Sequence, residues 1–449
     1  MSTIEKHDMT RGKILLPLVS FTIPLVLGNL FQLTYNAADS VIVGKYVGEQ
    51  ALAAVGTSTP IMNIAILLIS GMCMGASVLM SSQYGAKDYD TLSRQISTTM
   101  LAGCGFSVVF SLLMLLLANP VLRLIRVPET AIPEAAAYLR IIFMGLIFTF
   151  MYNFLANTMR ALGDSKTPLY FLVTSAFLNI FGDLFFVVVL RWGVAGSAIA
   201  TVCSEGLCCL LCGIYIKKKI PLLCLGKKWW VFDKSLLGKT VSYGSTSAMQ
   251  QVCLQLGKLI IQSVVNTQGV AVMAAFTAVN RVDDFAYTPQ QNIGHAMTTF
   301  LAQNKGAGHK ERMKKGFQTG LLIELVYSIG LFCVIWGLAP QIMTLFAEDG
   351  DAQVVSLGIS YLHLISWMYI LPGLTNGVQG FFRGIGDLKV TLYSTFMNMF
   401  GRVVAVFVMI RLLQMEFASL AWANMVGWIV MLLFEVPLLV KSMRNGECG

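Results

Sequence analysis

Apolar residues form long runs, separated by short polar segments, from one end of the 449-residue chain to the other. A helix that crosses a bilayer needs about 20 mostly apolar residues. Runs of that length lie at residues 14–43, 52–80, 96–118, 135–159, 169–190, 194–216, 237–266, 270–301, 317–340, 354–382, 390–410 and 417–440. The short alternating segments of a membrane β-barrel are not found, so the pattern predicts an all-α polytopic membrane protein with twelve transmembrane helices.

The composition argues against a soluble protein. Only 12% of the residues are charged, against about 25% in a soluble domain, which is too little charge to cover a wet surface. The net charge of +9 does not indicate a nucleic-acid partner, because the basic residues lie mostly in short loops between spans. The polar head at 1–13 and the long apolar run after it do not fit a cleavable signal peptide, so we expect the first span to be retained.

The distribution of Lys and Arg between the loops predicts the orientation. If the N-terminus is cytoplasmic, 23 of the 32 basic residues fall on the cytoplasmic side and six on the outer side. Positive residues accumulate in short cytoplasmic loops. We therefore expect a multi-pass protein of the cell membrane with both termini, and the basic loop at 217–239, in the cytoplasm.

The chain repeats itself at about half its length. The sequence RALGD at 160–164 returns as RGIGD at 383–387, and LNIFG at 178–182 returns as MNMFG at 397–401. Six spans followed by six related spans keep one orientation, as in the parallel repeats of transporters. We predict two pseudo-twofold-related six-helix lobes at 1–216 and 237–449, joined by a cytoplasmic loop at 217–236, with a transported molecule bound between the lobes.

Ionisable side chains inside membrane spans are costly, and they usually line a pathway or bind a partner. Three spans of the first lobe carry polar residues at helical spacing, which places them on one face of each helix. They are Gln32, Tyr35 and Asp39 in the first span, Asn179 and Asp183 in the fifth, and Thr201 and Glu205 in the sixth. We regard Gln32 and Glu205 as accessory members of this set.

Such an oxygen-rich set of side chains has two chemical uses. Carboxylic acids that are buried near one another hold protons readily, which suits a proton carrier. Carboxylate, amide and hydroxyl oxygens also suit a hard cation such as Na⁺. The residues leave H⁺ and Na⁺ open as the coupling ion, and they indicate no other cofactor or metal.

The charges inside later spans favour structural roles. Arg281, Asp283 and Asp284 lie close together in the eighth span, where we expect a local ion pair, and Arg281 is also a candidate accessory residue of the transport pathway. Glu324 and Glu435 we interpret as structural.

Several segments together resemble the multidrug and toxic compound extrusion (MATE) family over nearly the whole chain. They are Pro24 with YNAADSVIVG at 35–44, QYGA at 83–86, and the repeated RALGD and RGIGD motifs. The resemblance implies two six-helix lobes around a central cavity. It also implies the export of organic cations and other amphiphilic compounds in exchange for H⁺ or Na⁺.

Within that family the chain is most similar to the DinF-like branch. The similarity implies a cation site in the first lobe, in which two carboxylates are surrounded by polar partners: Asp39, Asp183, Tyr35, Asn179 and Thr201. It also implies that the first helix bends near Pro24. The carboxylates that the NorM-like branch carries in the seventh and tenth spans are absent here, since glutamines and Asn376 take their place.

Other functions are less well supported. A lipid-linked saccharide flippase of the same broad superfamily would share the two-lobe fold, but it would favour a more cationic cavity than these carboxylates provide. No HExxH, P-loop or dinucleotide motif is found, so we expect neither an enzyme nor direct use of ATP. The expected partners are a small molecule and the lipid bilayer, with no nucleic acid, and the chain is expected to be a monomer.

The predicted orientation can be tested with a cysteine placed at position 228, in a variant without native thiols. An impermeant thiol reagent added to intact cells should leave this cysteine unlabelled, because the loop is expected to lie inside. Labelling from the outside would contradict the orientation.

Overall fold

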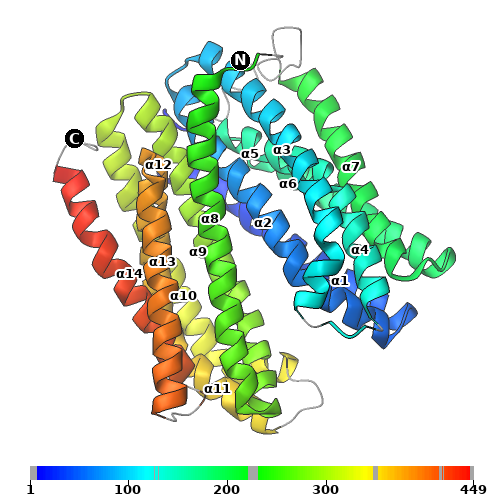
Figure 1. Cartoon of the computed structure of the whole chain (residues 1–449). Helices are drawn as coiled ribbons and strands as arrows, with labels where there is room; N and C mark the ends of the chain where they lie inside the picture. The colour runs from blue at the N-terminus through cyan, green and yellow to red at the C-terminus, as the bar shows by residue number, and fades with distance from the viewer. Residues whose placement is uncertain are drawn as a thin grey trace. The chain divides into compact units, whose positions relative to one another are not determined.

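The computed structural model describes residues 8–125, 127–129, 131–220, 231–346, 352–413, 417 and 419–444 of the chain. Within these ranges nearly every residue is helical and no strand occurs (Figure 1). The first half contains α1 (Leu15–Tyr46), α2 (Glu49–Gly85), α3 (Tyr89–Leu124), α4 (Ile132–Met144), α5 (Leu146–Ala161), α6 (Lys166–Asp183), the π-helical η2 (Leu184–Val189) and α7 (Gly193–Lys219).

The second half follows the same plan. It contains α8 (Lys234–Val265), η5 (Asn266–Gln268), α9 (Val270–Gly306), α10 (Lys310–Phe346), α11 (Ala352–Ser366), η7 (Trp367–Tyr369), α12 (Ile370–Ile385), α13 (Leu388–Phe407), the π-helical η8 (Val408–Leu412) and α14 (Ser419–Arg444). Each of the twelve predicted spans coincides with one helix or with consecutive helices of this series. Residues 221–230, which include the labelling position 228, lie outside the described residues.

Nine helical segments in the described part of the chain are long and apolar enough to cross a membrane, and α4 with α5, bent by 47°, makes a tenth. The other two predicted spans are α8 and α9, with 32 and 37 residues. They are long enough to cross but carry more polar side chains. The chain is thus a multi-pass membrane protein built from helices.

The internal repeat extends to the irregular parts of the backbone. In the first half the helix breaks at Gly145, between α4 and α5, and in the second half it breaks at Trp367–Tyr369, between α11 and α12. A π-helical segment follows both α6 and α13. The sequence predicted the repeat but not these interruptions, because hydropathy does not distinguish a broken span from a continuous one.

The repeated RALGD and RGIGD motifs end one helix and start the next. Gly386 ends α12 in the left-handed conformation with φ +87°, and Gly163 follows α5 with φ +90°. The carboxylate of Asp387 accepts from the backbone N–H of Val390 at 3.4 Å, and that of Asp164 accepts from Thr167 at 3.0 Å. Both motifs are therefore architectural helix caps.

The helices form two compact units. Unit 1 comprises Ile23–Ala248 with Met1–Asp8, and unit 2 comprises Met9–Thr22 with Met249–Gly449. The division differs from the predicted lobe boundary in that it falls within α8 and also within α1. The first part of α8 stays in unit 1 because α2 approaches it closely, since a Cβ added at Gly75 would lie 2.3 Å from the carbonyl oxygen of Tyr243.

The residues just before α1, from Met9 on, belong to unit 2 because side chains of unit 2 form hydrogen bonds with their backbone. The guanidinium of Arg312 on α10 donates to the carbonyl oxygens of Met9 at 3.1 Å, Arg11 at 2.9 Å and Gly12 at 2.7 Å. The backbone N–H of Met9 in turn donates to Gln303 on α9 at 3.2 Å. These contacts hold the start of the chain against the ends of two unit 2 helices.

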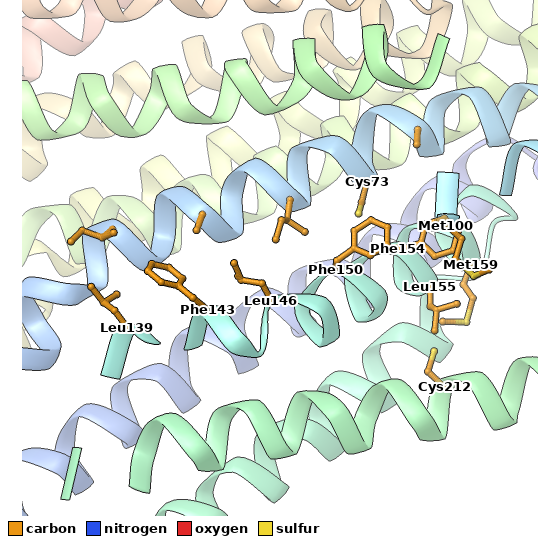
Figure 2. Close-up of a cluster of buried hydrophobic side chains, with 14 of the residues drawn as sticks. Cys73, Met100, Leu139, Phe143, Leu146, Phe150, Phe154, Leu155, Met159 and Cys212 are labelled. Atoms are coloured by element: carbon orange, nitrogen blue, oxygen red, sulfur yellow. The ribbon is translucent and has the colours of Figure 1, made fainter. Parts of the chain in front are cut away.

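Unit 1 has its apolar core between α2 and the broken span α4–α5. Figure 2 shows Phe143, Phe150 and Phe154 lying along that span, with Cys73 of α2 beside them. In unit 2 the closest packing is between α9 and α12, where small residues let the backbones approach. A Cβ added at Gly380 would lie 2.7 Å from the carbonyl oxygen of Gly294, which is the small-residue packing common in membranes.

The outward faces of these helices are apolar. Exposed side chains recur at helical spacing, as with Val109, Leu112 and Leu116 on α3, and Leu116 is 78% exposed. On α13 the exposed apolar side chains, again at helical spacing, are Phe396, Phe400 and Phe407. Exposed apolar stripes of this size are stable against lipid but not against water.

Two glycines of α3 provide a matched test of the unit 1 core. A Cβ at Gly103 would lie 1.9 Å from the ring of Phe150, whereas a Cβ at Gly105 would meet nothing within 4 Å. Gly103→Ala should lower the midpoint of thermal unfolding in detergent, because overpacking of this kind destabilises a fold by about 1–3 kcal/mol. Gly105→Ala should leave the midpoint unchanged or raise it, since alanine favours the helix by about 1 kcal/mol. Equal midpoints for the two variants would contradict the packing described.

Candidate functional site

The carboxyl groups of Asp39 on α1 and Asp183 on α6 lie within hydrogen-bonding reach of each other in unit 1. The hydroxyl of Ser197 on α7 donates to Asp39 Oδ1 at 2.7 Å. Asp183 is fully buried, and neither of its carboxylate oxygens has a hydrogen-bond partner among the described residues. The structure thus brings together the two carboxylates that the sequence singled out.

The backbone around Asp183 explains how the pair forms. Asp183 is the last residue of α6, and the π-helical η2 begins directly after it. Such π segments are rare and often occur at functional sites. On the same side, α6 and α7 approach closely, because a Cβ at Gly182 would lie 2.9 Å from the Cβ of Ala200. This close approach places Asp183 near the Ser197 face of α7.

A second group of polar side chains continues along α7. The amide of Asn179, one turn before Asp183, donates to Thr201 Oγ1 at 3.2 Å. One turn further, Glu205 Oε2 accepts from the hydroxyl of Thr149 on α5 at 2.5 Å. The predicted member Asn179 therefore lies on α6 with Asp183, and Thr201 and Glu205 lie on α7 with Ser197.

The tyrosines of the site come from α1 and α4. Tyr35 is close enough to interact electrostatically with Asp39 and Glu205, and it lies within hydrogen-bonding reach of Gln32. The side chain of Gln32 is exposed. The phenol of Tyr138 on α4 is buried and interacts with both Asp39 and Asp183. Two phenols and several carboxyl groups thus share one polar region.

An apolar cluster borders this region. It contains Val43, one turn beyond Asp39, and Val194 and Ala198, which flank Ser197 on α7. Val55 of α2 and Ile142 of α4 complete it. These apolar neighbours cannot donate hydrogen bonds to the acidic pair, and apolar surroundings raise the cost of leaving a charge without a partner.

Three members of the site were missed by the sequence reasoning. Ser197 lies four residues before Thr201, so extending the stripe of the sixth span by one turn would have found it. Tyr138 and Thr149 were not among the predicted residues. The last two belong to the broken span α4–α5, whose facing direction depends on the 47° bend and cannot be read from spacing alone.

The acidic pair can hold one monovalent cation. Two adjacent carboxylates repel each other when both are ionised, and burial adds to the cost. Neither Asp39 nor Asp183 forms an ion pair with a basic side chain in the described ranges, and no group of three or more His, Cys, Asp or Glu residues there could hold a metal ion. Carboxylate, hydroxyl and amide oxygens fit either H⁺ or Na⁺, as the sequence indicated.

Pro24 lies inside α1, which continues through it from Leu15 to Tyr46. Since proline has no N–H, the carbonyl of Ser20 lacks its usual helical donor. The division of α1 between the two compact units falls between Thr22 and Ile23, next to this weak point.

In unit 2 the charges of α9 pair differently from what we expected. Lys258 on α8 forms an ion pair with Asp284, with Nζ and Oδ1 3.2 Å apart. Asp283 is buried and accepts from the hydroxyls of Tyr361 at 3.0 Å and Tyr369 at 2.6 Å. The side chain of Arg281 is exposed, and it joins neither acid in the described part of the chain.

Comparison with known proteins gives a consistent result. The MatE family model matches residues 24–185 and, a second time, residues 247–409, so each half of the repeat matches it separately. The chain is 32% identical over 392 residues to the probable multidrug resistance protein YpnP of Bacillus subtilis (strain 168), covering 87% of this chain and 86% of that protein.

Two solved structures show the same fold. A MOP superfamily transporter from Pyrococcus furiosus, described as having a binding pocket of reverse polarity that suggests a different function, matches with a TM-score of 0.91 and 21% identity over 99% of both chains. An outward-facing multidrug resistance MATE family transporter matches with a TM-score of 0.91 and 22% identity, covering 100% of this chain and 99% of that one.

The acidic pair should be a source of instability. Asp183→Asn removes one charge and supplies an amide that can donate to Asp39, so we expect this variant to be more stable by about 1–3 kcal/mol at alkaline pH, with a higher unfolding midpoint. At acid pH the proton neutralises the wild-type pair, and the difference should shrink. Thermal unfolding of both proteins in detergent across a pH series measures this. A variant less stable than wild type at every pH would contradict the arrangement.

Proposed function

The chain belongs to the MatE family of membrane transporters, and we propose that it is a secondary active antiporter that exports small organic compounds in exchange for H⁺ or Na⁺. Two relatives that match it over most of their length are named probable multidrug resistance proteins. We propose cationic or amphiphilic substrates, since the polar region of unit 1 carries carboxylates. The observation that carries the proposal is the contact between the partly buried Asp39 and the fully buried Asp183, which form no ion pair with a basic side chain in the described ranges.

The coupling cation would change the energy of unit 1 directly. With a cation bound, the pair is neutralised and can share it, so Asp39 and Asp183 stay together. Without the cation the two carboxylates repel each other. A conformation in which they lie further apart, or are open to water, is then favoured. A ligand shifts a conformational equilibrium only through such a difference in affinity between states.

Helix α1 is well suited to transmit this change. Asp39 lies in its second half, within unit 1, while Met9–Thr22 belongs to unit 2 and is anchored through Arg312. Pro24 lies at the junction, where the missing hydrogen bond makes bending easier. Movement of Asp39 would then be passed along one helix to the other unit.

The proposed orientation completes the transport cycle. With both termini in the cytoplasm of a cell membrane, the cation enters from outside and the compound leaves. The region that includes Asp39 lies towards the outer end of α1 in this orientation, where an entering cation would reach it.

Removal of either carboxylate should uncouple transport. Asp39→Asn and Asp183→Asn should each reduce gradient-driven efflux in sealed vesicles to the level of vesicles without protein, because a neutral amide does not need the cation. Asp90→Asn is a matched control, since Asp90 is exposed in the first turn of α3, and it should retain wild-type efflux. The assay uses a panel of cationic dyes with imposed H⁺ and Na⁺ gradients. Wild-type rates in both carboxylate variants would sink the coupling site.

Pro24→Ala should slow transport more than it weakens binding. Alanine restores the N–H that can donate to the carbonyl of Ser20, so the bend costs more while the acidic pair is unchanged. Efflux rate and equilibrium dye binding, measured on the same preparation, separate the two effects. A parallel loss of both, or no change in rate, would argue against a bending role.

A further inference from the structure

Glu324 is a buried acid of unit 2 without a hydrogen-bond partner in the described structure. It lies in the middle of α10 with 1% of its surface exposed. Neither carboxylate oxygen has a hydrogen-bond partner among the described residues. The sequence suggested a structural role, but a structural carboxylate is normally paired with donors or a basic group. Glu324 is not, so a different role has to be considered.

Gln290 on α9 adds a second polar atom without a partner at this place, its side-chain oxygen Oε1. It is fully buried, and its Nε2 donates to Ser328 Oγ at 3.1 Å and to the carbonyl oxygen of Tyr369 at 2.8 Å. Because a carbonyl can only accept, the amide nitrogen must face it, which fixes the orientation of the amide group. The Oε1 atom of Gln290 is then left without a donor in the described structure.

These side chains converge on Gly373 of α12. A Cβ added there would lie 2.9 Å from Ser328 Oγ, 3.2 Å from Gln290 Nε2 and 3.4 Å from Glu324 Oε2. Polar groups from two helices thus meet at a point on a third, where only glycine leaves space.

The backbone is also broken at this point. The short 3-10 segment Trp367–Tyr369 separates α11 from α12, and the carbonyl of Tyr369 accepts from side chains of α9 and α10. Interrupted helices that present carbonyl oxygens to the interior are a feature of cation sites in transporters. Carboxylate, hydroxyl, amide and carbonyl oxygens are a donor set for H⁺ or Na⁺.

No neighbouring basic side chain neutralises Glu324 in the described residues, so a cation can still bind to its carboxylate. Tyr327, which interacts electrostatically with Glu324, also lies on α10 and donates to the carbonyl of Ala286. The helices packed on α10 carry these ionisable groups: Arg281, Asp283, Asp284, Tyr287, His295 and Lys305 on α9, Tyr361 and His363 on α11, Tyr369 in η7, and Arg383 on α12. No ion pair joins Glu324 to a Lys or Arg in the described ranges.

We propose that Glu324, with Ser328 and Gln290, forms a second site for a monovalent cation, H⁺ or Na⁺, within unit 2. It is not a copy of the site in unit 1, since the corresponding helix of the repeat, α3, has its only acidic residue, Asp90, in its first turn. A role of this cation in coupling rests on the proposed antiport function, whereas binding of the cation does not.

Chemical labelling tests the binding directly. A hydrophobic carbodiimide reacts with protonated carboxyl groups in apolar surroundings, and mass spectrometry of peptides from the purified protein locates the product. Labelling of Glu324 should fall as the pH rises. If Na⁺ binds, it should protect Glu324 more than choline does, and if H⁺ alone binds, the two salts should give the same labelling. Glu435 is the matched control, because it is equally buried but lies beside Arg383, and it should label less.

Stability provides the second measurement. The unfolding midpoint of Glu324→Gln should exceed that of wild type increasingly as the pH rises, and Na⁺ should reduce the difference if Na⁺ is the ligand. Gly373→Ala should weaken any Na⁺ protection or shift the pH dependence of labelling, while Gly330→Ala on α10, with nothing within 4 Å of the added Cβ, should not. Labelling that is insensitive to pH and Na⁺ would overturn the proposal, as would no labelling combined with a pH-independent stability difference.

Both measurements are made at Glu324 and can be repeated in the Asp39→Asn background. Labelling of Glu324 that does not respond to pH or Na⁺, in a wild-type protein whose dye efflux depends on Asp39 and Asp183, would remove only the second site. Wild-type efflux in both Asp39→Asn and Asp183→Asn, with normal labelling of Glu324, would instead remove the first site.

Discussion

The contact between Asp39 and Asp183, which have no basic partner in the part of the chain that the structure describes, is the constraint on which the proposed function depends. Asp39 and Asp183 lie within reach of each other, in a unit whose core and outer faces are apolar. An ionised pair in such surroundings is unstable, and one bound cation relieves the repulsion. Under the proposed function, the energy of unit 1 depends on whether that cation is present, which is what a coupled transporter requires.

The fold supplies the geometry that makes this dependence useful. The π-helical segment after Asp183 and the close approach of α6 and α7 place the two acids together with Ser197. The helix that carries Asp39 also contains Pro24 and begins within the other compact unit. A change in charge at one residue can thus become a change in the shape of a helix shared by both units.

Much of this architecture could be predicted from the sequence, because hydropathy, loop charge and the RALGD repeat are local signals. They gave twelve spans that match the observed helices, and the predicted MATE family is confirmed by two separate matches. The site was predicted in part, since Asp39, Asp183, Asn179 and Thr201 follow helical spacing. Tyr138 and Thr149 could not be predicted, because the bend between α4 and α5 decides where they face. Glu324 looked structural because its lack of a partner is a property of tertiary packing alone.

Infrared difference spectroscopy of the purified protein would test the shared cation most directly. Lowering the pH in Na⁺-free buffer should produce the carbonyl-stretch band of a protonated carboxylic acid from the acidic pair. The account predicts that this component of the spectrum is lost or shifted in Asp39→Asn and equally in Asp183→Asn, since the two groups hold one cation together. Spectra in which both variants keep the full wild-type change, or in which only one of the two variants alters it, would contradict a shared site.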